Sequence, residues 1–350
     1  MKTILLGIMD SNIGGVNRFI LDFLSQHKDE NFIILTNAPV HKSYMHEIPE
    51  NITIELIISV LHPIKLYLTT RKIIKNYNID TLYLNISTNL FYPVLKAAYD
   101  CNVRERIIHS HSSYSADSSF IKRNAIVAIN KLLRKKMNKL STNRKACSDK
   151  AAEWLFGKNV NFDFVYNKVK KQKFIFNPTQ RNLLRKDLEV ESLLIIGFVG
   201  GFNYPKNISY FLNIAKKLSK CRNDFCIIML GDGELKISFE KKIKKMSLEK
   251  YFKLLGNKSN VNEYYNIFDC FVMPSRFEGL PIVGVEAQIN GLKCYFSDRI
   301  TKQAKITQEA EYFSLRNVSK LVRKIASMKI GEHKNTPLIN FNNFLIKEDN

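Results

Sequence analysis

Two glutamates eight positions apart, Glu278 and Glu286, stand in the segment FVMPSRFEGLPIVGVEAQINGLKCYFS, residues 271–297. Carboxylates can only accept hydrogen bonds, and sugar hydroxyls are good donors to them. An apolar strand precedes the pair, and Pro281 suits the first turn of a helix. A helix N-terminus directs N–H groups and partial positive charge outward, which suits a phosphate. The segment therefore predicts a pocket for a ligand with both phosphate and hydroxyl groups.

The spacing of these glutamates and its setting resemble the E-x7-E motif of the family-4 retaining glycosyltransferases, and PSRFEGLPIVGVEAQ resembles the capsule and exopolysaccharide branch of that family. The resemblance implies that Glu286 accepts hydrogen bonds from the ribose of a nucleotide-sugar and that Glu278 holds hydroxyls of the donor sugar. It also implies that N–H groups of the following loop bind the departing diphosphate. That loop comprises Gly279, Leu280, Pro281 and Ile282. Two solvated surface glutamates on an ordinary α/β unit are the alternative.

The segment FVGGFNYPKN, residues 198–207, closes an expected strand and resembles the family's G-R-x-x-x-x-K element, whose two cations clamp the donor diphosphate. Lys206 matches the lysine, whereas Gly201 stands in place of the arginine. A single cation still stabilises charge that develops on a leaving diphosphate. Arg276 is a candidate substitute for the missing cation, with a surface role as its alternative.

Gly14 and Gly15 follow the first expected strand and open the first helix, in SNIGGVNRFILDF. Glycine lets a backbone approach a phosphate or sugar closely. The pair is not part of a G-x-G-x-x-G pattern, which argues against a dinucleotide cofactor. A Gly-Gly pair at this place in the family faces donor and acceptor, so the resemblance implies substrate binding by both glycines. A tight strand-to-helix turn is the alternative.

His109 and His111 end the strand-like string RIIHSH, and alternation places them on one face. Ligands of open α/β sheets bind beyond the carboxyl ends of the strands, so His111 is the better site candidate and His109 could be a core residue. HSHSS resembles the family's HSHN element, which implies that His111 shapes the reacting face beside the donor sugar. The two histidines could bind a metal ion, but no carboxylate that could serve as a further ligand lies nearby in the sequence. The resemblance implies no metal and no other cofactor.

Two further elements have weaker signals. LGDGEL, residues 230–235, is a glycine-rich turn that the family shares, and its plainer interpretation is that Gly231 and Gly233 supply positive φ. Asn257 and Lys258 follow the strand-like string KLLG, where the nucleobase contacts of the family fall. Both are predicted as substrate-binding residues on that ground.

Composition sets the class of protein but not its partner. The chain has 350 residues, of which 45% are apolar, enough for two ordinary domains. Its net charge of +22, from 54 Lys and Arg against 32 Asp and Glu, attracts nucleotide diphosphates, nucleic acid or acidic lipid alike. The six cysteines form no C-x-x-C pair, which favours free thiols in a reducing cytoplasm. No apolar run approaches the ~18 residues of a membrane-spanning helix, and the apolar N-terminus is expected to be a strand rather than a signal peptide.

Apolar runs alternate with helical patterns, which predicts doubly wound parallel sheets. In the first half, strands are expected at 2–8, 32–36, 52–58, 81–86, 106–111 and 145–148, with helices at 15–25, 64–76, 91–99 and 118–140. In the second half, strands are expected at 193–199, 225–230, 252–255 and 271–273, with helices at 208–218, 235–246, 261–268 and 318–328. The resemblance implies an α/β protein of the GT-B class, with two Rossmann-like domains that face one another across a cleft. We expect an acceptor-side domain over 1–165, a linker over 166–190, a nucleotide-sugar-binding domain over 191–330 and a tail over 331–350 that returns to the first domain.

The expected helix 118–140 is strongly basic. Its polar arc carries Arg123, Lys131, Arg134 and Lys135. Lys122, Lys136 and Lys139 flank an apolar face that includes Ile121, Ala125, Ile129, Leu132 and Leu133. A basic amphipathic helix can lie on an anionic membrane, and an ordinary packed helix of a basic protein has the same pattern. Both interpretations stay open from sequence.

The resemblance runs over nearly the whole chain and implies a retaining hexosyltransferase. The resemblance also implies a UDP-sugar as the nucleotide-sugar donor and a lipid-linked glycan of a cell-surface polysaccharide as the acceptor. The enzyme would be cytoplasmic or peripheral on the inner face of the cytoplasmic membrane, without a specific nucleic acid partner. Two rivals remain. One is a catalytically silent partner subunit of the same fold, which Gly201 supports. The other is a nucleic-acid-binding protein, which the charge suggests but no aromatic-basic motif supports.

Overall fold

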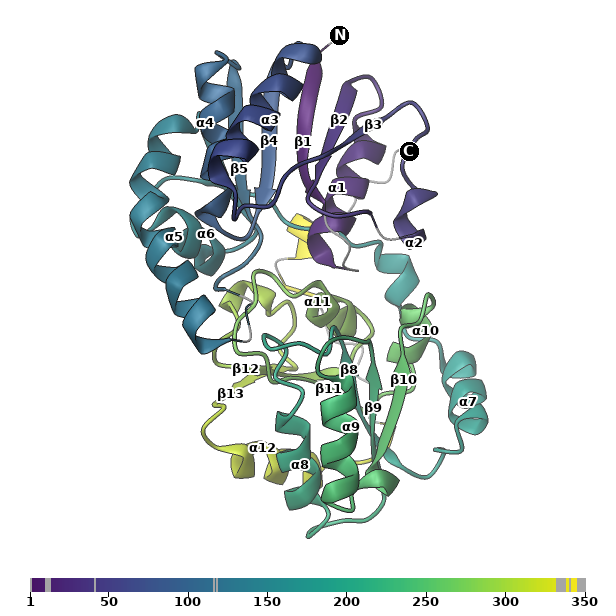
Figure 1. Ribbon diagram of the computed structural model, residues 1–350. Helices are drawn as coiled ribbons and strands as arrows, with labels where there is room; N and C mark the ends of the chain where they lie inside the picture. Colours follow the sequence, from purple (N-terminus) through teal and green to yellow (C-terminus); the bar gives the residue numbers. More distant parts are fainter. Residues whose placement is uncertain are drawn as a thin grey trace. The chain divides into compact units, whose positions relative to one another are not determined.

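The computed structural model describes residues 2–9, 14–40, 42–115, 117, 119–331, 338–339 and 341–344. The chain divides into two compact units, Met1–Asn167 and Lys168–Asn350 (Figure 1). Each unit is built around its own sheet, of seven strands in the first and six in the second, and all the strand pairs are parallel. The doubly wound α/β architecture expected from the sequence is confirmed.

The sheet of the first unit has the strand order β3-β2-β1-β4-β5-β6-β7. Its strands are β1 (Thr3–Met9), β2 (Asn31–Thr36), β3 (Thr53–Leu56), β4 (Thr81–Ile86), β5 (Glu105–Ser110), β6 (Asn143–Ala146) and β7 (Asp163–Phe164). The chain builds outward from β1 to β3 and then resumes at β4 on the other side of β1. The direction of winding therefore reverses between β1 and β4, and ligands of open α/β sheets bind at such a point.

The helices of the first unit are α1 (Gly15–Gln26), α2 (Lys42–Met45), α3 (Pro63–Asn76), α4 (Tyr92–Asp100), α5 (Phe120–Leu140) and α6 (Asp149–Phe156). A layer forms in which α3 packs against α4, α4 against α5, and α5 against α6. The hydroxyl of Ser148 caps α6 by accepting a hydrogen bond from the Ala151 N–H (3.1 Å).

The sheet of the second unit has the strand order β10-β9-β8-β11-β12-β13. Its strands are β8 (Leu194–Val199), β9 (Phe225–Leu230), β10 (Phe252–Gly256), β11 (Cys270–Met273), β12 (Lys293–Ser297) and β13 (Ala310–Phe313). The helices are α7 (Pro178–Asp187), α8 (Tyr210–Leu218), α9 (Lys236–Lys245), α10 (Val261–Tyr265), α11 (Ile282–Ile289) and α12 (Val318–Ala326). Here the winding reverses between β8 and β11.

A buried ionic cluster fastens α7 to this second sheet. Asp269, which is fully buried, binds the guanidinium groups of Arg181 (2.5 Å) and Arg185 (3.2 Å) and accepts the N–H of Ile195 at 2.7 Å. Two cations and a backbone donor satisfy the carboxylate, which burial requires. The helix within the stretch expected to link the domains is thus bound to the second unit.

Several short elements lie outside the sequence expectations. β12 follows α11 after only three residues, and the four residues of β13 include the charged Glu311, so neither has a clear strand pattern.

In the described part of the tail, the Val169 N–H donates to the Phe344 carbonyl (2.8 Å) and the Ile339 N–H to that of Ile306 (2.7 Å), all within the second unit. Residues 332–337, 340 and 345–350, which belong to the tail expected to reach the first domain, lie outside the described residues. None of the described helices combines the length and apolar content that crossing a membrane requires.

Candidate functional site

The two turns that follow β8 and β11 meet where the winding of the second sheet reverses. The Arg276 N–H donates to the Pro205 carbonyl at 2.7 Å, and the Asn207 side chain donates to the Pro274 carbonyl at 2.9 Å. These bonds hold the turn that carries Lys206 against the turn before α11. The structure therefore brings together two of the segments singled out in the sequence.

Lys206 and Glu278 form an ion pair between these turns. Lys206 Nζ lies 2.7 Å from Glu278 Oε1, and the two side chains are 19% and 12% exposed. Such a charge-assisted bond fixes both groups, and their partial exposure leaves them open to a ligand. The arrangement provides a cation and a hydrogen-bond acceptor side by side.

Gly201 and Arg276 lie on either side of the Lys206 turn. A Cβ added to Gly201 would meet the Asn203 amide nitrogen at 2.9 Å, so the space for a larger residue is closed only by the end of a flexible side chain. The Arg276 guanidinium stacks 4.6 Å from the ring centroid of Tyr204 and donates to the Tyr204 carbonyl at 3.0 Å. Arg276 is thus held against the turn that carries Lys206.

The loop from Gly279 to Pro281 is buried and leads directly into α11, which begins at Ile282 with Pro281 as its N-cap. Pro281 has no N–H, and no side chain of the described residues caps this end. A helix leaves its first N–H groups without a helical partner, so the start of α11 presents donors and partial positive charge. Gly279, Leu280, Pro281 and Ile282 therefore form one structural unit next to Glu278.

Glu286 lies in the fifth position of α11, and Tyr265, the last residue of α10, holds its carboxylate. The Tyr265 hydroxyl donates to Glu286 Oε2 at 2.7 Å, and the Tyr265 side chain is fully buried. Burial raises the pKa of Glu286 to about 7, although the bond from Tyr265 opposes that shift. Burial also raises the pKa of Tyr265 well above its ordinary value, so the phenol keeps its proton and remains a donor. Glu286 is therefore poised to titrate near neutral pH.

The glycine-rich turn after β9 packs against the turn after β8. Gly231 has a φ of +134°, and a Cβ on it would lie 2.0 Å from the Gly200 carbonyl oxygen. Gly233 has a φ of +153°, and its Cβ would lie 2.7 Å from the Phe202 carbonyl oxygen. Close backbone approach and positive φ account for both glycines, as the plainer interpretation of LGDGEL predicted.

Asn257 and Lys258 are exposed in the loop that follows β10. β10 is the edge strand of the second sheet, and β9 separates it from β8. The structure thus places these two residues on the same carboxyl edge as Lys206 but two strands away from it.

In the first unit, Gly14 and Gly15 are exposed at the start of α1. Gly14 has an extended backbone with a φ of −157°, which any residue can adopt. A Cβ on either glycine would meet no atom of the described residues within 4 Å. Neither glycine is therefore required by the packing of the part of the chain that the structure describes.

His111 and His109 lie together at the carboxyl end of β5, with ring centroids 3.9 Å apart. His111 Nε2 lies 2.9 Å from the side-chain amide oxygen of Asn85, which can only accept, so Nε2 carries the proton and Nδ1 is left as an acceptor. His109 is fully buried, and its Nδ1 lies 3.2 Å from the Tyr83 hydroxyl. Burial lowers the pKa of His111 to about 3 and that of His109 well below its ordinary value, so both are neutral at physiological pH.

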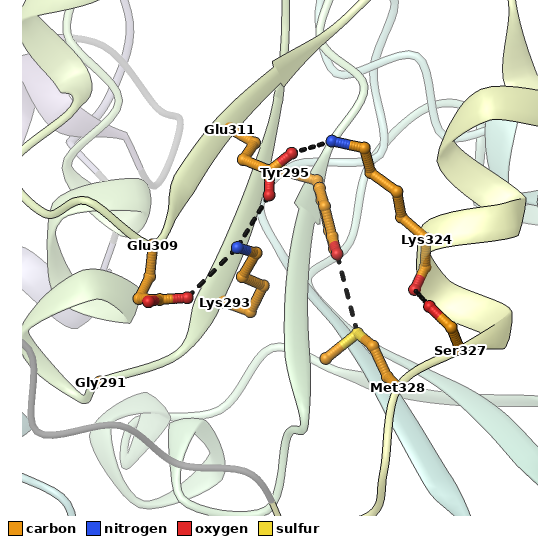
Figure 2. A pocket seen from close by; sticks show the side chains of 8 residues that line it. All are labelled: Gly291, Lys293, Tyr295, Glu309, Glu311, Lys324, Ser327 and Met328. Carbon is orange, nitrogen blue, oxygen red and sulfur yellow. Dashed lines mark hydrogen bonds and ion pairs between the residues drawn. The ribbon is translucent and has the colours of Figure 1, made fainter.

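A separate pocket of about 280 Å³ opens at the opposite edge of the second sheet (Figure 2). Lys293, the first residue of β12, binds Glu309 at 3.2 Å and Glu311 at 2.8 Å, and Lys324 binds Glu311. Figure 2 shows these four side chains directed toward one another, with Tyr295 directed toward Met328. The charges of the two lysines and the two glutamates cancel, so the pocket carries no net charge. It also lies at the amino ends of the strands, whereas open parallel sheets bind ligands at the carboxyl ends. We therefore place the candidate site at the carboxyl edge.

Three residues of these sites escaped the sequence analysis, namely Tyr265, Asn85 and Tyr83. Each lies in an apolar strand or a short helix, where the sequence pattern predicts a core position. The only signal in the sequence is their partners, Glu286, His111 and His109, because a buried polar group needs a hydrogen-bond partner. Among the described residues, no three His, Cys, Asp or Glu side chains gather in a group that could hold a metal ion.

Three known proteins similar to this chain are named as glycosyltransferases. Residues 180–340 match the family model described as Glycosyl transferases group 1. The chain is 31% identical over 213 residues to EpsF of Bacillus subtilis (strain 168), whose name places it among the glycosyltransferases, with 59% of this chain and 54% of EpsF covered. It is 27% identical over 246 residues to the capsular polysaccharide biosynthesis glycosyltransferase CapH of Staphylococcus aureus, with 68% and 64% covered.

A third relative is the UDP-Gal:α-D-GlcNAc-diphosphoundecaprenol α-1,3-galactosyltransferase of Escherichia coli, 31% identical over 136 residues, with 38% of this chain and 35% of the relative covered. The chain thus spans between about a third and two thirds of the length of these relatives.

The fold also has close counterparts among solved structures. The crystal structure of Anabaena HepE in complex with UDP and glucose superimposes with a TM-score of 0.76 at 15% identity, covering 93% of this chain and 89% of HepE. At this identity the likeness establishes the fold, which is the GT-B fold of two parallel-sheet α/β units. The chain therefore has the GT-B fold, and its residues 180–340 match the Glycosyl transferases group 1 model.

Proposed function

We propose that this protein is a retaining glycosyltransferase that moves a sugar from a UDP-sugar to a glycan acceptor in the synthesis of a cell-surface polysaccharide. The observation that carries the proposal is the Lys206–Glu278 ion pair, which lies at the reversal point of the second sheet and next to the start of α11. A cation and helix N–H groups suit a diphosphate, and a carboxylate suits sugar hydroxyls.

The donor would be held along the carboxyl edge of the second sheet. Lys206 and the N–H groups at the start of α11 would stabilise the charge that develops on the leaving UDP. Glu278 would accept hydrogen bonds from the donor sugar, and Glu286 would accept them from the ribose. Asn257 and Lys258 would contact the base. These protein cations and dipoles can perform the electrostatic work without a metal, and we assign no protein nucleophile.

Gly14, Gly15 and His111 would serve the sugar and the acceptor. The open space around the two glycines would let a substrate approach the backbone closely. His111 is neutral and offers Nδ1 as an acceptor, which suits orienting a hydroxyl rather than donating a proton.

The acceptor would be a lipid-linked glycan at the inner face of the cytoplasmic membrane, with the enzyme bound there peripherally. The Escherichia coli relative is named for a diphosphoundecaprenol-linked substrate, and the net charge of +22 favours an anionic surface.

The experiment that tests the proposal is a thermal-shift screen of nucleotide-sugars followed by assay of the stabilising donor. A ligand that binds the folded state raises the apparent Tm. We expect one UDP-sugar to raise Tm, free UDP to be released slowly in water, and transfer to a lipid-linked acceptor to keep the anomeric configuration by NMR. Stabilisation without any release of UDP would instead indicate a silent partner subunit. Tight, salt-resistant DNA binding with no response to nucleotides would overturn the assignment altogether.

A further inference from the structure

The longest helix of the first unit, α5, exposes a row of apolar side chains to solvent. In α5, Ile121 and Leu132 are 79% and 75% exposed, and Ala125 and Ala128 between them are also exposed. These positions recur at the spacing of one helical face, so they form a continuous stripe along α5. We call Ile121, Ala125, Ala128 and Leu132 the α5 stripe.

The opposite side of α5, which packs on the unit, is polar at its centre. Asn130 is fully buried, where its side-chain amide oxygen accepts the backbone N–H of Asn89 at 2.6 Å and its side-chain nitrogen donates to the Trp154 carbonyl at 2.9 Å. Arg134 donates to the same carbonyl at 2.8 Å. The helix is thus anchored at its centre by hydrogen bonds and near its C-terminal end by the buried Met137 and Leu140, whereas Ile121 and Leu132 are directed away from the core.

This arrangement overturns one part of the sequence interpretation. The face of Ile121, Ile129 and Leu132 read equally well as the packed side of an ordinary helix, but all three side chains are exposed. Arg123 and Arg134, placed on the solvated arc, instead donate to the carbonyls of Asp117 and Trp154.

Exposed lysines border the α5 stripe on both sides. At 100° per residue, Lys131 and Lys135 lie along one border, and Lys122 and Lys136 lie along the other. An apolar stripe with cationic borders matches an anionic bilayer surface, where acyl chains cover the stripe and headgroups pair with the lysines. A protein partner would have to present an apolar groove lined with acidic residues to do the same.

Another helix of the same layer, α3, also exposes large apolar side chains beside a lysine. α3 lies beyond α4 in this layer and exposes Ile64 (74%) and Leu68 (55%), with Lys65 exposed between them. Large exposed apolar side chains gathered on a set of helices mark an interaction surface rather than ordinary solvated protein.

We infer that the α5 stripe inserts into the interfacial region of an anionic lipid membrane, with the bordering lysines on the headgroups. The inference deepens the proposed peripheral membrane location and rests on it. It assigns the contact to apolar insertion along α5 rather than to the diffuse positive charge of the chain.

The test uses the full-length protein and vesicles of phosphatidylcholine with or without phosphatidylglycerol. Ile121→Gln/Leu132→Gln keeps every charge, and we expect its partition onto anionic vesicles to fall by about a hundredfold, roughly tenfold per side chain. Lys131→Gln/Lys135→Gln should lose about fivefold per lysine at low salt. The matched controls are on the lysine-rich α9 of the second unit, where Ile237 is 68% exposed. Ile237→Gln and Lys241→Gln/Lys245→Gln should bind within about twofold of the parent.

A fluorescent probe tests insertion directly. Tryptophan at position 132, made as Leu132→Trp, should shift its emission to shorter wavelength on anionic vesicles and be quenched by lipids brominated in the acyl chain, whereas Ile237→Trp should not. The inference is overturned if Ile121→Gln/Leu132→Gln partitions like the parent, if the α9 controls lose as much binding, or if the tryptophan at 132 ignores the vesicles. No donor or acceptor is present in these measurements. A protein that inserts but transfers no sugar would therefore refute only the proposed reaction. One that releases UDP but does not bind vesicles would refute this inference and the proposed peripheral location, and would leave the reaction standing.

Discussion

Lys206 Nζ donates to Glu278 Oε1 across 2.7 Å, although the two residues lie 72 positions apart and on turns after different strands. Each side chain is mostly buried and holds the other in place. The carboxylate neutralises the cation that we assign to the donor diphosphate. We expect a donor to draw Lys206 partly away from Glu278 and so to leave the carboxylate free to accept hydrogen bonds from sugar hydroxyls.

Replacing Lys206 with alanine should lower turnover by about 10²–10³, because a donor to developing negative charge is lost. It also leaves Glu278 half-buried without its cation, so the free energy of unfolding should fall by roughly 1–3 kcal/mol. Steady-state UDP release and denaturant unfolding measure the two effects. Lys236→Ala, which removes an exposed ion pair with Asp232 in the neighbouring turn, is the control and should change neither. If Lys206→Ala turns over like the parent, the diphosphate cation is elsewhere, with Arg276 as the first candidate.

Glu286 should make the stability of the protein depend on pH. Its pKa rises from an ordinary 4.5 to about 7 in the folded protein. A raised pKa in an acid means that the folded state favours the protonated form, so this group costs no stability below about pH 4.5 and an increasing amount as the pH rises to 7. Glu286→Gln should therefore raise Tm at pH 8 and leave it nearly unchanged at pH 4. Equal shifts of Tm at both pH values would refute the buried, titrating carboxylate. The same variant should weaken UDP binding at pH 8, because an amide accepts hydrogen bonds less strongly than a carboxylate.

Tyr265→Phe should move the pH dependence of UDP binding. The hydroxyl of Tyr265 lowers the pKa of Glu286, so its removal should shift the midpoint at which affinity is gained to higher pH. The ring keeps its edge contacts with Phe174 and Phe268, so packing changes little. Calorimetric titration with UDP across pH 5–9 measures the midpoint. Tyr251→Phe, which loses one bond to Asn223 (3.0 Å) at the other edge of the sheet, is the matched control and should keep the parent's midpoint. A midpoint unmoved in Tyr265→Phe would show that the tyrosine does not act through Glu286.

Gly201→Arg should raise turnover if the site lacks only a second cation. The new side chain must displace the Asn203 amide, which lies 2.9 Å from the Cβ position and can rotate away. Gly201→Ala meets the same atom without adding charge and separates the steric effect from the electrostatic one. We expect UDP affinity and turnover to increase in the arginine variant and not in the alanine variant. An arginine variant that folds normally but is no more active than the alanine variant would show that the site has no place for this charge.

His111 should stay neutral and keep one tautomer throughout the physiological range. Burial lowers the pKa of His111 to about 3, and Asn85 holds the proton on Nε2. Nitrogen-15 NMR of labelled histidine should show a protonated Nε2 and a bare Nδ1 for this residue from pH 5 to pH 8. Titration of His111 within this range, or a proton on Nδ1, would contradict the role of Asn85.

Local pattern alone was enough to predict much of this protein. The strand, loop and helix around Glu278 and Glu286 follow from a buried run, Gly279 and Pro281, because turn and helix-start preferences act over a few residues. The alternation of strands and helices likewise predicted two parallel sheets, since each element shows its own period. β12 and β13 were missed because they are short and partly charged, so their strand form depends on the neighbours they pair with.

Tertiary structure decided which side chains meet and which side of a helix is covered. Lys206 meets Glu278 because β8 and β11 are neighbours in the sheet although they are distant in the chain. Tyr265 meets Glu286 because α10, which precedes β11, and α11, which follows it, are brought together. The side of α5 that packs is set by Asn130 and its partners on distant elements, which outweigh the local apolar pattern. Burial and hydrogen bonding are properties of the assembled neighbourhood, so the pKa of Glu286 and the exposure of the α5 stripe could not be deduced from the order of residues.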